Sequence, residues 1–342
     1  MAIFLTGDTH GDFSRFRPDI FYAQTGLTKD DCTIICGDFG GIWDGSPEEQ
    51  GQLDWLEQRP YTTLFVSGNH ENYDLLAQYP VEEWHGGQVQ RVRPSVIHLM
   101  RGQVYDIQGR KFFAMGGASS HDIQDGILEP DDPLFKKKCR RLNARGAMYR
   151  VNHQSWWAAE LPSEEEYQTA RANLGKHGWE VDYIITHCCP SSVQDELSSG
   201  FYQADALTDF LDEIAQRCRF RYQFFGHYHT NKVVKLLDVQ RGQLVELDFS
   251  DVGDNVLVDV VFVVGGGGFP DGGLGIVLEP RFGPLPHCVL VGFVCIYLAS
   301  LFQGRSQLFF ALLLGFRQHV FVDGFSSFRV MARCIPTFPA AI

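Results

Sequence analysis

Five short β-rich runs in this chain each end in residues of the kind that bind metal ions, and this repetition restricts the fold more than any other feature. The runs are Ala2 to Leu5, Thr33 to Cys36, Thr62 to Val66, Tyr183 to Ile185 and the apolar residues just before His227. The residues that close them are Asp8 with His10, Asp38, Asn69 with His70, His187, and His227 with His229. Residues i and i+2 of an extended segment point to the same side, so His227 and His229 can converge on one object. One candidate for that object is a metal ion.

Helix-like segments separate the runs, at Pro47 to Gln58, Ser163 to Lys176 and Ala204 to Arg217. Strands that alternate with helices predict an α/β fold built in layers. In such folds, sites form beyond the carboxyl ends of the strands, which is where all five groups of polar residues lie. A further strand is expected at Lys111 to Met115. It ends in a turn of small residues that contains His121, a candidate substrate contact.

Each motif taken singly has an ordinary explanation, because a Gly-Asp pair usually forms a turn and a lone His is usually a surface or core residue. Five coincident strand ends favour a joint metal site instead. The set of two carboxylates, one amide and four imidazoles suits Mn, Fe, Zn, Co or Ni better than Mg or Ca alone. Seven such groups exceed the needs of one tetrahedral ion and match two ions about 3.5–4 Å apart that share a carboxylate. Mn is the metal we expect to work best in vitro.

In chain order the motifs read GDTHG, GD, GNHE, a strand-end His and GHYH, and over residues 1–235 the chain resembles the calcineurin-like metallophosphoesterases. The resemblance implies a four-layer α/β/β/α sandwich with a dinuclear metal site at the carboxyl ends of the strands. It assigns one metal to Asp8, His10 and His229, the other to Asn69, His187 and His227, and the bridge between them to Asp38. It also implies phosphoester hydrolysis, as a phosphatase or a phosphodiesterase, by in-line attack of a metal-bound hydroxide with His70 as the general acid.

The second motif departs from the protein Ser/Thr phosphatases of this superfamily, which carry GDxxDRG where this chain has GDFGGIWDG. Gly41 stands in place of the acid that would pair with His70, and the arginine is missing, which argues against a dedicated protein phosphatase. Asp44 is an alternative partner for His70. Alternative contacts for phosphate are Arg101, Arg145 and Arg150. A non-catalytic binding scaffold on the same fold is a further alternative, and the presence of every ligand position argues against it.

The stretch from Lys136 to Arg150 concentrates seven basic residues in an otherwise acidic chain. It is either a solvated helix face or a lid whose cations meet phosphate, and the aromatic pair Trp156 and Trp157 follows it. The formal net charge of −13 argues against binding a long nucleic acid, because such binding depends on Lys and Arg that neutralise phosphates. A small phosphorylated substrate or a phosphopeptide remains compatible with a local metal centre.

Cysteine usage and the first residues of the chain predict a cytoplasmic location. The nine cysteines form no CxxC pair and lie mostly in apolar runs, which is typical of a reducing compartment. The N-terminal sequence MAIFLTGD has no basic region before its apolar residues, so we expect a first strand and not a signal peptide.

The composition changes after Lys235, the last lysine of the chain. We predict a metallophosphoesterase domain at residues 1–249 and a Gly/Phe/Val-rich C-terminal extension of unknown role at residues 250–342. The apolar run at residues 289–302 is shorter than the ~20 residues of a membrane-spanning helix. A poorly ordered tail, a membrane hairpin through residues 285–322 and a compact second domain are the alternatives for this extension.

Overall fold

The computed structural model describes residues 2–198 and 202–229 of the chain, together with four two-residue strands further on. These strands pair in antiparallel fashion, β13 (Leu236–Leu237) with β14 (Leu244–Val245) and β15 (Phe321–Val322) with β16 (Val330–Met331). The chain divides into two compact units, Met1–Pro280 and Arg281–Ile342, and the fold described below is that of the first. The predicted boundary at residue 249 and nearly all of the predicted membrane contact at residues 285–322 lie outside the described residues. No helix within the described residues is both long and apolar enough to cross a bilayer.

Two β-sheets form the centre of the first unit. The larger sheet has the order β1 (Ile3–Thr6), β2 (Cys32–Ile35), β3 (Thr62–Phe65), β6 (Val96–Leu99), β5 (Gly87–Arg93) and β4 (Val81–Trp84). The smaller sheet has the order β12 (Tyr222–Phe224), β11 (Tyr183–Thr186), β8 (Arg110–Met115) and β7 (Gln103–Ile107). Neighbouring strands are parallel from β1 to β6 in the first sheet and from β12 to β8 in the second, and the remaining pairs are antiparallel.

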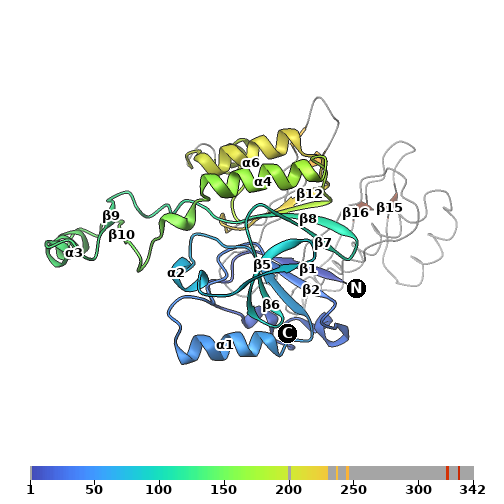
Figure 1. Ribbon diagram of the computed structural model, residues 1–342, viewed down its shortest axis with the longest axis horizontal. Helices are drawn as coiled ribbons and strands as arrows, with labels where there is room; N and C mark the ends of the chain where they lie inside the picture. The colour runs from blue at the N-terminus through green and yellow to red at the C-terminus, as the bar shows by residue number, and fades with distance from the viewer. Residues whose placement is uncertain are drawn as a thin grey trace, which may run out of the picture. The chain divides into compact units, whose positions relative to one another are not determined.

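The central strands are apolar on both faces because each sheet is covered on both sides. In β2, Ile34 belongs to a core cluster formed by residues of both sheets, whereas its neighbour Ile35 packs in the cluster that includes α1. In β11, Ile185 likewise lies between the sheets, and Ile184 packs in the cluster that includes α4 and α6. Figure 1 shows α1 on one side of the sheets and α4 and α6 on the other. The predicted four-layer α/β/β/α arrangement is confirmed.

The three predicted helices are present, and side-chain caps explain where they begin. Helix α1 (Pro47–Glu57) starts after Ser46, whose hydroxyl accepts a hydrogen bond from the Glu49 backbone N–H at 3.2 Å. Helix α4 (Glu164–Lys176) starts with a reciprocal capping box between Ser163 and Glu166, and α6 (Ala206–Arg217) is capped by Asp205. Other helical elements within the described residues are α2 (Tyr73–Leu76), α5 (Ser191–Ser198) and the 3₁₀ turns Ser14–Phe16, Tyr22–Gly26 and Ala158–Glu160.

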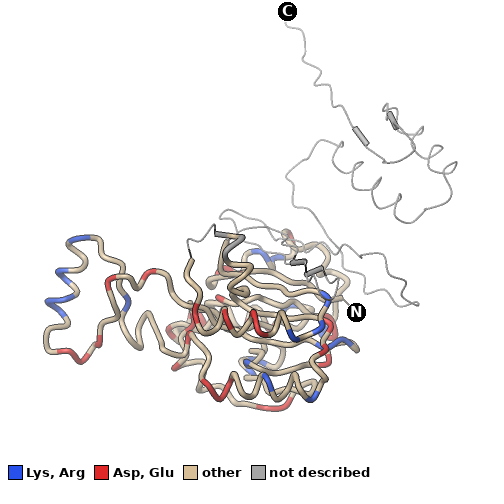
Figure 2. The backbone as a smooth tube through the Cα atoms, turned by 90° about the horizontal axis from the view of Figure 1, so that it is seen from above, with Lys and Arg blue, Asp and Glu red and all other residues tan. Residues whose placement is uncertain are grey.

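An arm projects from the layered body between β8 and α4 (Figure 1). It contains the parallel strands β9 (Ile127–Leu128) and β10 (Arg150–Val151) and helix α3 (Phe135–Asn143), whose basic residues are blue in Figure 2. At its base, Trp157 is buried and its indole N–H donates to Asp74 Oδ2 at 2.7 Å. Trp157 of the aromatic pair is therefore part of the core.

Candidate metal centre

Six of the seven predicted ligand residues extend from two groups of adjacent parallel strands. Asp8, Asp38 and Asn69 follow β1, β2 and β3, which are neighbours in the larger sheet. His187 follows β11, and His227 follows β12, its neighbour in the smaller sheet. His229 lies two residues further along the same loop. The carboxyl ends of both sheets therefore contribute to one cluster of side chains.

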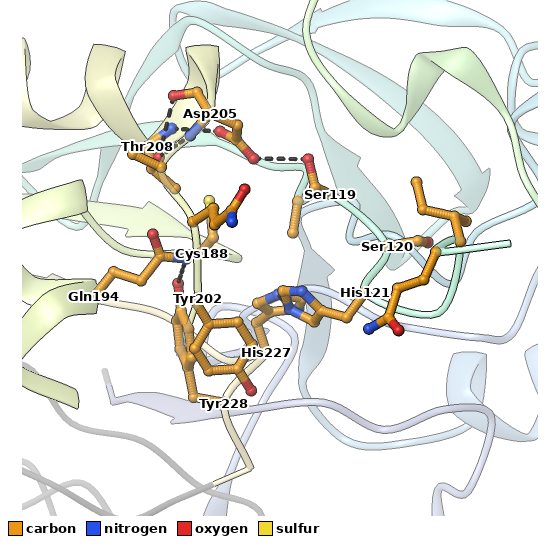
Figure 3. Close-up of a pocket in the computed structure, with 15 residues that line it drawn as sticks. Ser119, Ser120, His121, Cys188, Gln194, Tyr202, Asp205, Thr208, His227 and Tyr228 are labelled. Carbon is orange, nitrogen blue, oxygen red and sulfur yellow. Dashed lines mark hydrogen bonds between the residues drawn. The ribbon is translucent and has the colours of Figure 1, made fainter. Parts of the chain in front are cut away.

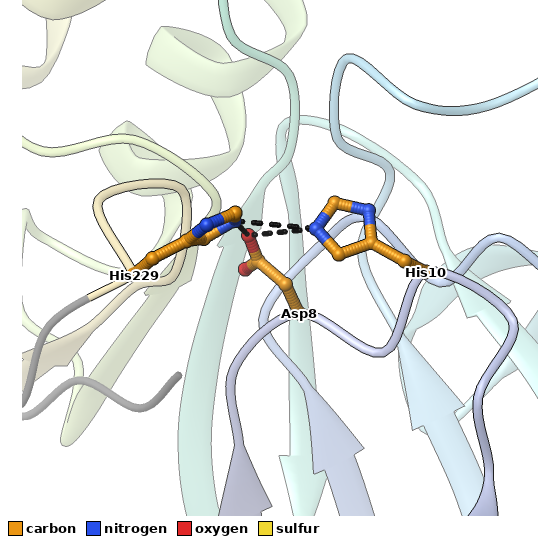
Figure 4. Close-up of side chains that lie close together, drawn as sticks. All are labelled: Asp8, His10 and His229. Carbon is orange, nitrogen blue, oxygen red and sulfur yellow. Dashed lines mark hydrogen bonds and ion pairs between the residues drawn. The ribbon is translucent and has the colours of Figure 1, made fainter. Parts of the chain in front are cut away.

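The first donor group consists of Asp8, His10 and His229 (Figure 4). His229 Nε2 lies 2.9 Å from Asp8 Oδ2 and 3.2 Å from His10 Nε2. His10 Nε2 lies 3.7 Å from the same carboxylate oxygen. Asp8 is buried, whereas the side chains of His10 and His229 are 35% and 53% exposed. This side of the cluster is therefore open to solvent and to a substrate.

The second donor group consists of Asp8, Asp38 and His187, all of them buried. His187 Nδ1 lies 2.8 Å from the carbonyl oxygen of Cys36, the geometry of an N–H donor, so the lone pair for a metal would be on Nε2. That Nε2 lies 3.3 Å from both Asp38 Oδ1 and Asn69 Oδ1. Asn69, a predicted ligand, therefore reaches this group as well.

Two carboxylates, and not one, lie between the donor groups. Asp38 Oδ2 lies 3.7 Å from His10 Nδ1, while its Oδ1 faces His187, so Asp38 reaches the histidines of both groups. Asp8 belongs to both groups through its two oxygens. The family resemblance implies a bridge at Asp38, and Asp8 also lies between the two groups of donors.

His121, which was predicted only as a substrate contact, lies beside His227 in the cluster. The backbone N–H of His227 donates to Asp8 Oδ1 at 2.9 Å, and its ring centroid lies 5.0 Å from that of His187. Its Nε2 lies 2.6 Å from Nε2 of His121. The two ring nitrogens thus point at each other, as those of His10 and His229 do.

His70, the predicted general acid, lies at the rim of the cluster. Its backbone N–H donates to Asp38 Oδ1 at 2.8 Å, and its half-buried ring packs edge-on against His10 at 5.2 Å between centroids. Burial lowers the pKa of the His70 imidazole, although Asp38 opposes this effect. A lowered pKa makes the imidazolium a stronger acid.

The predicted phosphate contacts occupy different places. Arg150 pairs with Asp122 at 2.6 Å, and its charge contributes to lowering the pKa of His70. Arg145 pairs with Asp125 at 2.5 Å within the arm. The structure thus relates Arg150, but not Arg145, to a residue of the cluster.

Two further candidates have other partners. Arg101 is buried and donates to the Tyr73 hydroxyl at 2.7 Å and to backbone carbonyls at residues 159 and 160. Asp44, the alternative partner for His70, is exposed, and its Oδ1 accepts from the Ser46 backbone N–H at 2.8 Å. Arg101 therefore stabilises the core, and Asp44 stabilises the loop before α1.

Sequence reasoning missed the backbone conformation that aims these side chains. His10, Asp38, His227 and His229 have φ angles of 46°, 45°, 71° and 45°, in the left-handed region that non-glycine residues rarely adopt. Glycines leave room beside the carboxylates, because a Cβ at Gly68 or Gly226 would overlap the Oδ1 atom of Asp38 or Asp8. The GN and GH pairs in the motifs were the available signal.

Glu71, the last residue of GNHE, was also missed. Its Oε1 accepts from the Phe39 backbone N–H at 2.8 Å and its Oε2 from the Gly40 backbone N–H at 3.4 Å. These bonds hold the loop that follows Asp38. Burial, with the charge of Asp38, raises the pKa of Glu71 to about 8.

The donor set fits metal cations. Buried carboxylates need positive partners, and among the described residues the charge partners recorded for Asp8 and Asp38 are histidines, with no Lys or Arg. Burial lowers the pKa of His187, yet Asp38 and Asp8 outweigh it and raise that pKa to about 9. The carboxylates therefore attract positive charge strongly, and divalent ions bound by oxygen and imidazole nitrogen would supply it.

The family model of the calcineurin-like phosphoesterases matches residues 1–231. The chain belongs to this family. The matched range contains both donor groups. Lariat debranching enzyme A of Xenopus laevis is 25% identical over 145 residues, 38% of this chain and 26% of that protein. The lariat debranching enzyme of Caenorhabditis briggsae is 21% identical over 260 residues, 66% of this chain and 46% of that protein. The chain thus spans less than half the length of these relatives.

Proposed function

We propose that this phosphoesterase cleaves phosphodiesters with two divalent ions, Mn²⁺ being the most effective in vitro. The observation that carries the proposal is the convergence of two donor groups that share the buried carboxylate of Asp8. Each group offers atoms within 4.8 Å of one another, as ligands of one ion require. Two ions held side by side clamp the oxygens of a phosphoester.

The proposed ligand sets are those that the family resemblance implies: the first equals the first donor group, and the second shares His187 with the second donor group. One ion is held by Asp8, His10 and His229, the other by Asn69, His187 and His227, with Asp38 between them. When bound, the ions supply positive charge to the phosphoryl oxygens and activate water for in-line attack. The half-exposed His10 and His229 leave this side accessible to the ester.

We assign the proton transfer to His70. It lies beside His10 and is fixed through its backbone by Asp38, so its ring stays at the rim where a leaving oxygen would emerge. Its imidazolium donates a proton to that oxygen, and Arg150 contributes positive charge nearby. The metal donors and the acid His70 lie in one cluster, and this argues against a non-catalytic binding scaffold.

A diester is favoured over a monoester by the relatives. Debranching, the activity in their names, requires cleavage of an ester that joins two parts of a molecule. The Ser/Thr phosphatase alternative is disfavoured at Gly41, where a Cβ would lie 2.7 Å from the Phe39 ring and 2.9 Å from the Phe13 ring. An acidic partner for His70 has no room at that position.

Hydrolysis of p-nitrophenyl phosphate and bis-p-nitrophenyl phosphate in the presence of Mn²⁺, with EDTA as control, tests the proposal. We expect a higher kcat/KM for the diester, and loss of both activities with EDTA. Asp8→Asn should abolish the activity, whereas the matched Asp19→Asn, at an exposed acid paired with Arg17, should not. A faster monoesterase would overturn the diester assignment, and activity that survives EDTA and Asp8→Asn would overturn the metal site.

A further inference from the structure

A cavity of about 580 Å³ adjoins the metal centre (Figure 3). His121 and His227 form part of its wall. The rest comes from the loop after β8, from α5 and the start of α6 with described residues of the loops before them, and from Tyr228. Small-molecule sites typically measure about 300–1,000 Å³, so the cavity is large enough for a substantial part of a substrate. Because His227 belongs to the proposed ligand set, a substrate group bound in the cavity would lie next to the phosphate that reacts at the metal centre.

The charge of the lining excludes an anionic group. None of the described residues that line the cavity is Lys or Arg. Its one carboxylate, Asp205, accepts from the Ser119 hydroxyl at 2.7 Å and from two backbone N–H groups at the start of α6, each at 2.9 Å. A second phosphate or a carboxylate would meet this acid without a compensating cation. The cavity therefore suits a neutral part of the substrate.

Aromatic rings and side-chain amides define what that neutral part is. The Tyr202 ring lies 4.4 Å from the His121 ring and packs edge-on against Tyr228 at 5.2 Å between centroids. Gln194 and Gln203 add amides, which offer both a donor and an acceptor. Gln194 is buried and donates to the Tyr228 hydroxyl at 3.4 Å. A planar group with hydrogen-bonding edges, such as a nucleobase, matches both features.

We infer that this cavity binds one nucleoside of the phosphodiester substrate, with its base stacked on Tyr202. The inference rests on the proposed function and narrows its substrate class to nucleotide diesters. It also agrees with the acidic chain, because recognition of one nucleoside beside the ester needs no long basic surface.

Two diesters with the same leaving group test the inference. Thymidine 5′-(p-nitrophenyl phosphate) carries a nucleoside, and methyl p-nitrophenyl phosphate carries none. We expect a lower KM for the thymidine ester. Tyr202→Leu should raise that KM by about tenfold to a hundredfold, the usual effect of removing a stacking ring, and leave both kcat values and the methyl ester unchanged. Tyr202→Phe should keep the wild-type KM, and Tyr22→Leu, at a tyrosine that is 61% exposed on the first unit, is the matched control.

The outcomes separate this inference from the proposed function. Equal kcat/KM for the two esters in the wild type would overturn the nucleoside site and leave the diesterase standing. An equal fall of kcat on both esters in Tyr202→Leu would mean that Tyr202 only positions His121 and His227. If the metal-loaded protein hydrolysed neither ester, the proposed function would fail. Saturation-transfer NMR with uncharged thymidine would then test nucleoside binding in the cavity without catalysis. Binding to the wild type that is lost in Tyr202→Leu would support the inference, and no binding to the wild type would overturn it.

Discussion

Replacing Gly68 by alanine should disable the metal centre without changing any ligand. The new Cβ would lie 2.8 Å from Asp38 Cγ, and closer still to Oδ1 and to the backbone nitrogen of the same residue. Ordinary contacts begin at 3.4 Å and Oδ1 would lie at 2.0 Å, so the Asp38 carboxylate and the new Cβ must separate by a further 1.4 Å, the difference between the two values. The φ angle of Gly68 lies outside the left-handed region, so alanine adds no backbone strain and the effect is steric.

The size of the loss follows from that displacement. A misplacement of about 1 Å in a catalytic site costs on the order of 10²-fold in rate, or about 2.7 kcal/mol of transition-state stabilisation. We expect a fall of this size in kcat/KM for bis-p-nitrophenyl phosphate with Mn²⁺, together with weaker metal binding. Activity, metal content by plasma mass spectrometry and thermal melting should be measured on the same preparation, so that a folding defect is recognised.

Gly51→Ala is the matched control, because Gly51 lies on the exposed face of α1 and its added Cβ would meet nothing within 4 Å. This variant should keep full activity and gain about 0.4–1 kcal/mol of stability. A folded Gly68→Ala protein with kcat/KM close to that of the wild type would refute the reasoning, because it would mean that the position of Asp38 does not matter for the reaction.

Four other changes test further parts of the structure. Asp38→Asn should weaken both ions together, since this carboxylate faces histidines of both donor groups; two tightly bound ions per chain in metal analysis would contradict the bridging role. His70→Asn should keep the metals and slow esters of poor alkoxide leaving groups by about 10²–10⁴-fold, and activated p-nitrophenyl esters much less. An equal loss on both kinds of ester would assign His70 to orienting phosphate. A chain that ends at Phe249 should stay active, because all proposed ligands precede that residue, and a folded, metal-loaded but inactive product would place later residues in the site. Burial lowers the pKa of His98 from 6.5 to about 3. As the pH falls, His98 therefore takes up a proton in the unfolded chain at a higher pH than in the folded chain. Unfolding free energy should therefore drop by about 2 kcal/mol between pH 7 and 5, and urea midpoints that fall equally in His98→Gln would exclude this cause.

The layers of the fold and the location of the site follow from local sequence patterns. Strands that alternate with helices predict a layered α/β fold, and polar residues after each strand predict a site at the carboxyl ends of the strands. Ser163 and Glu166 show the same for a helix start, because a capping box needs only residues three positions apart. Patterns of this kind act within one element, so a single sequence contains them.

The relations between site residues are different, because they depend on how the two sheets pack. His10 and His229 are 219 positions apart, and His121 and His227 are 106 positions apart, yet their ring nitrogens lie 3.2 Å and 2.6 Å from each other. No spacing rule contains these contacts. The shared position of Asp8 and the route of the arm away from the body are likewise products of tertiary structure, so local sequence patterns do not contain them.

The placement of the ligands on strands of both sheets has a consequence for the lifetime of the protein. Ions bound there would join the two halves of the sandwich, so their binding free energy would add to the free energy of unfolding. At an ion concentration 100 times the Kd, this addition is about 2.7 kcal/mol per site. A cell short of metal would then lose this protein by proteolysis of the opened apo chain, so the abundance of the protein would follow the metal supply.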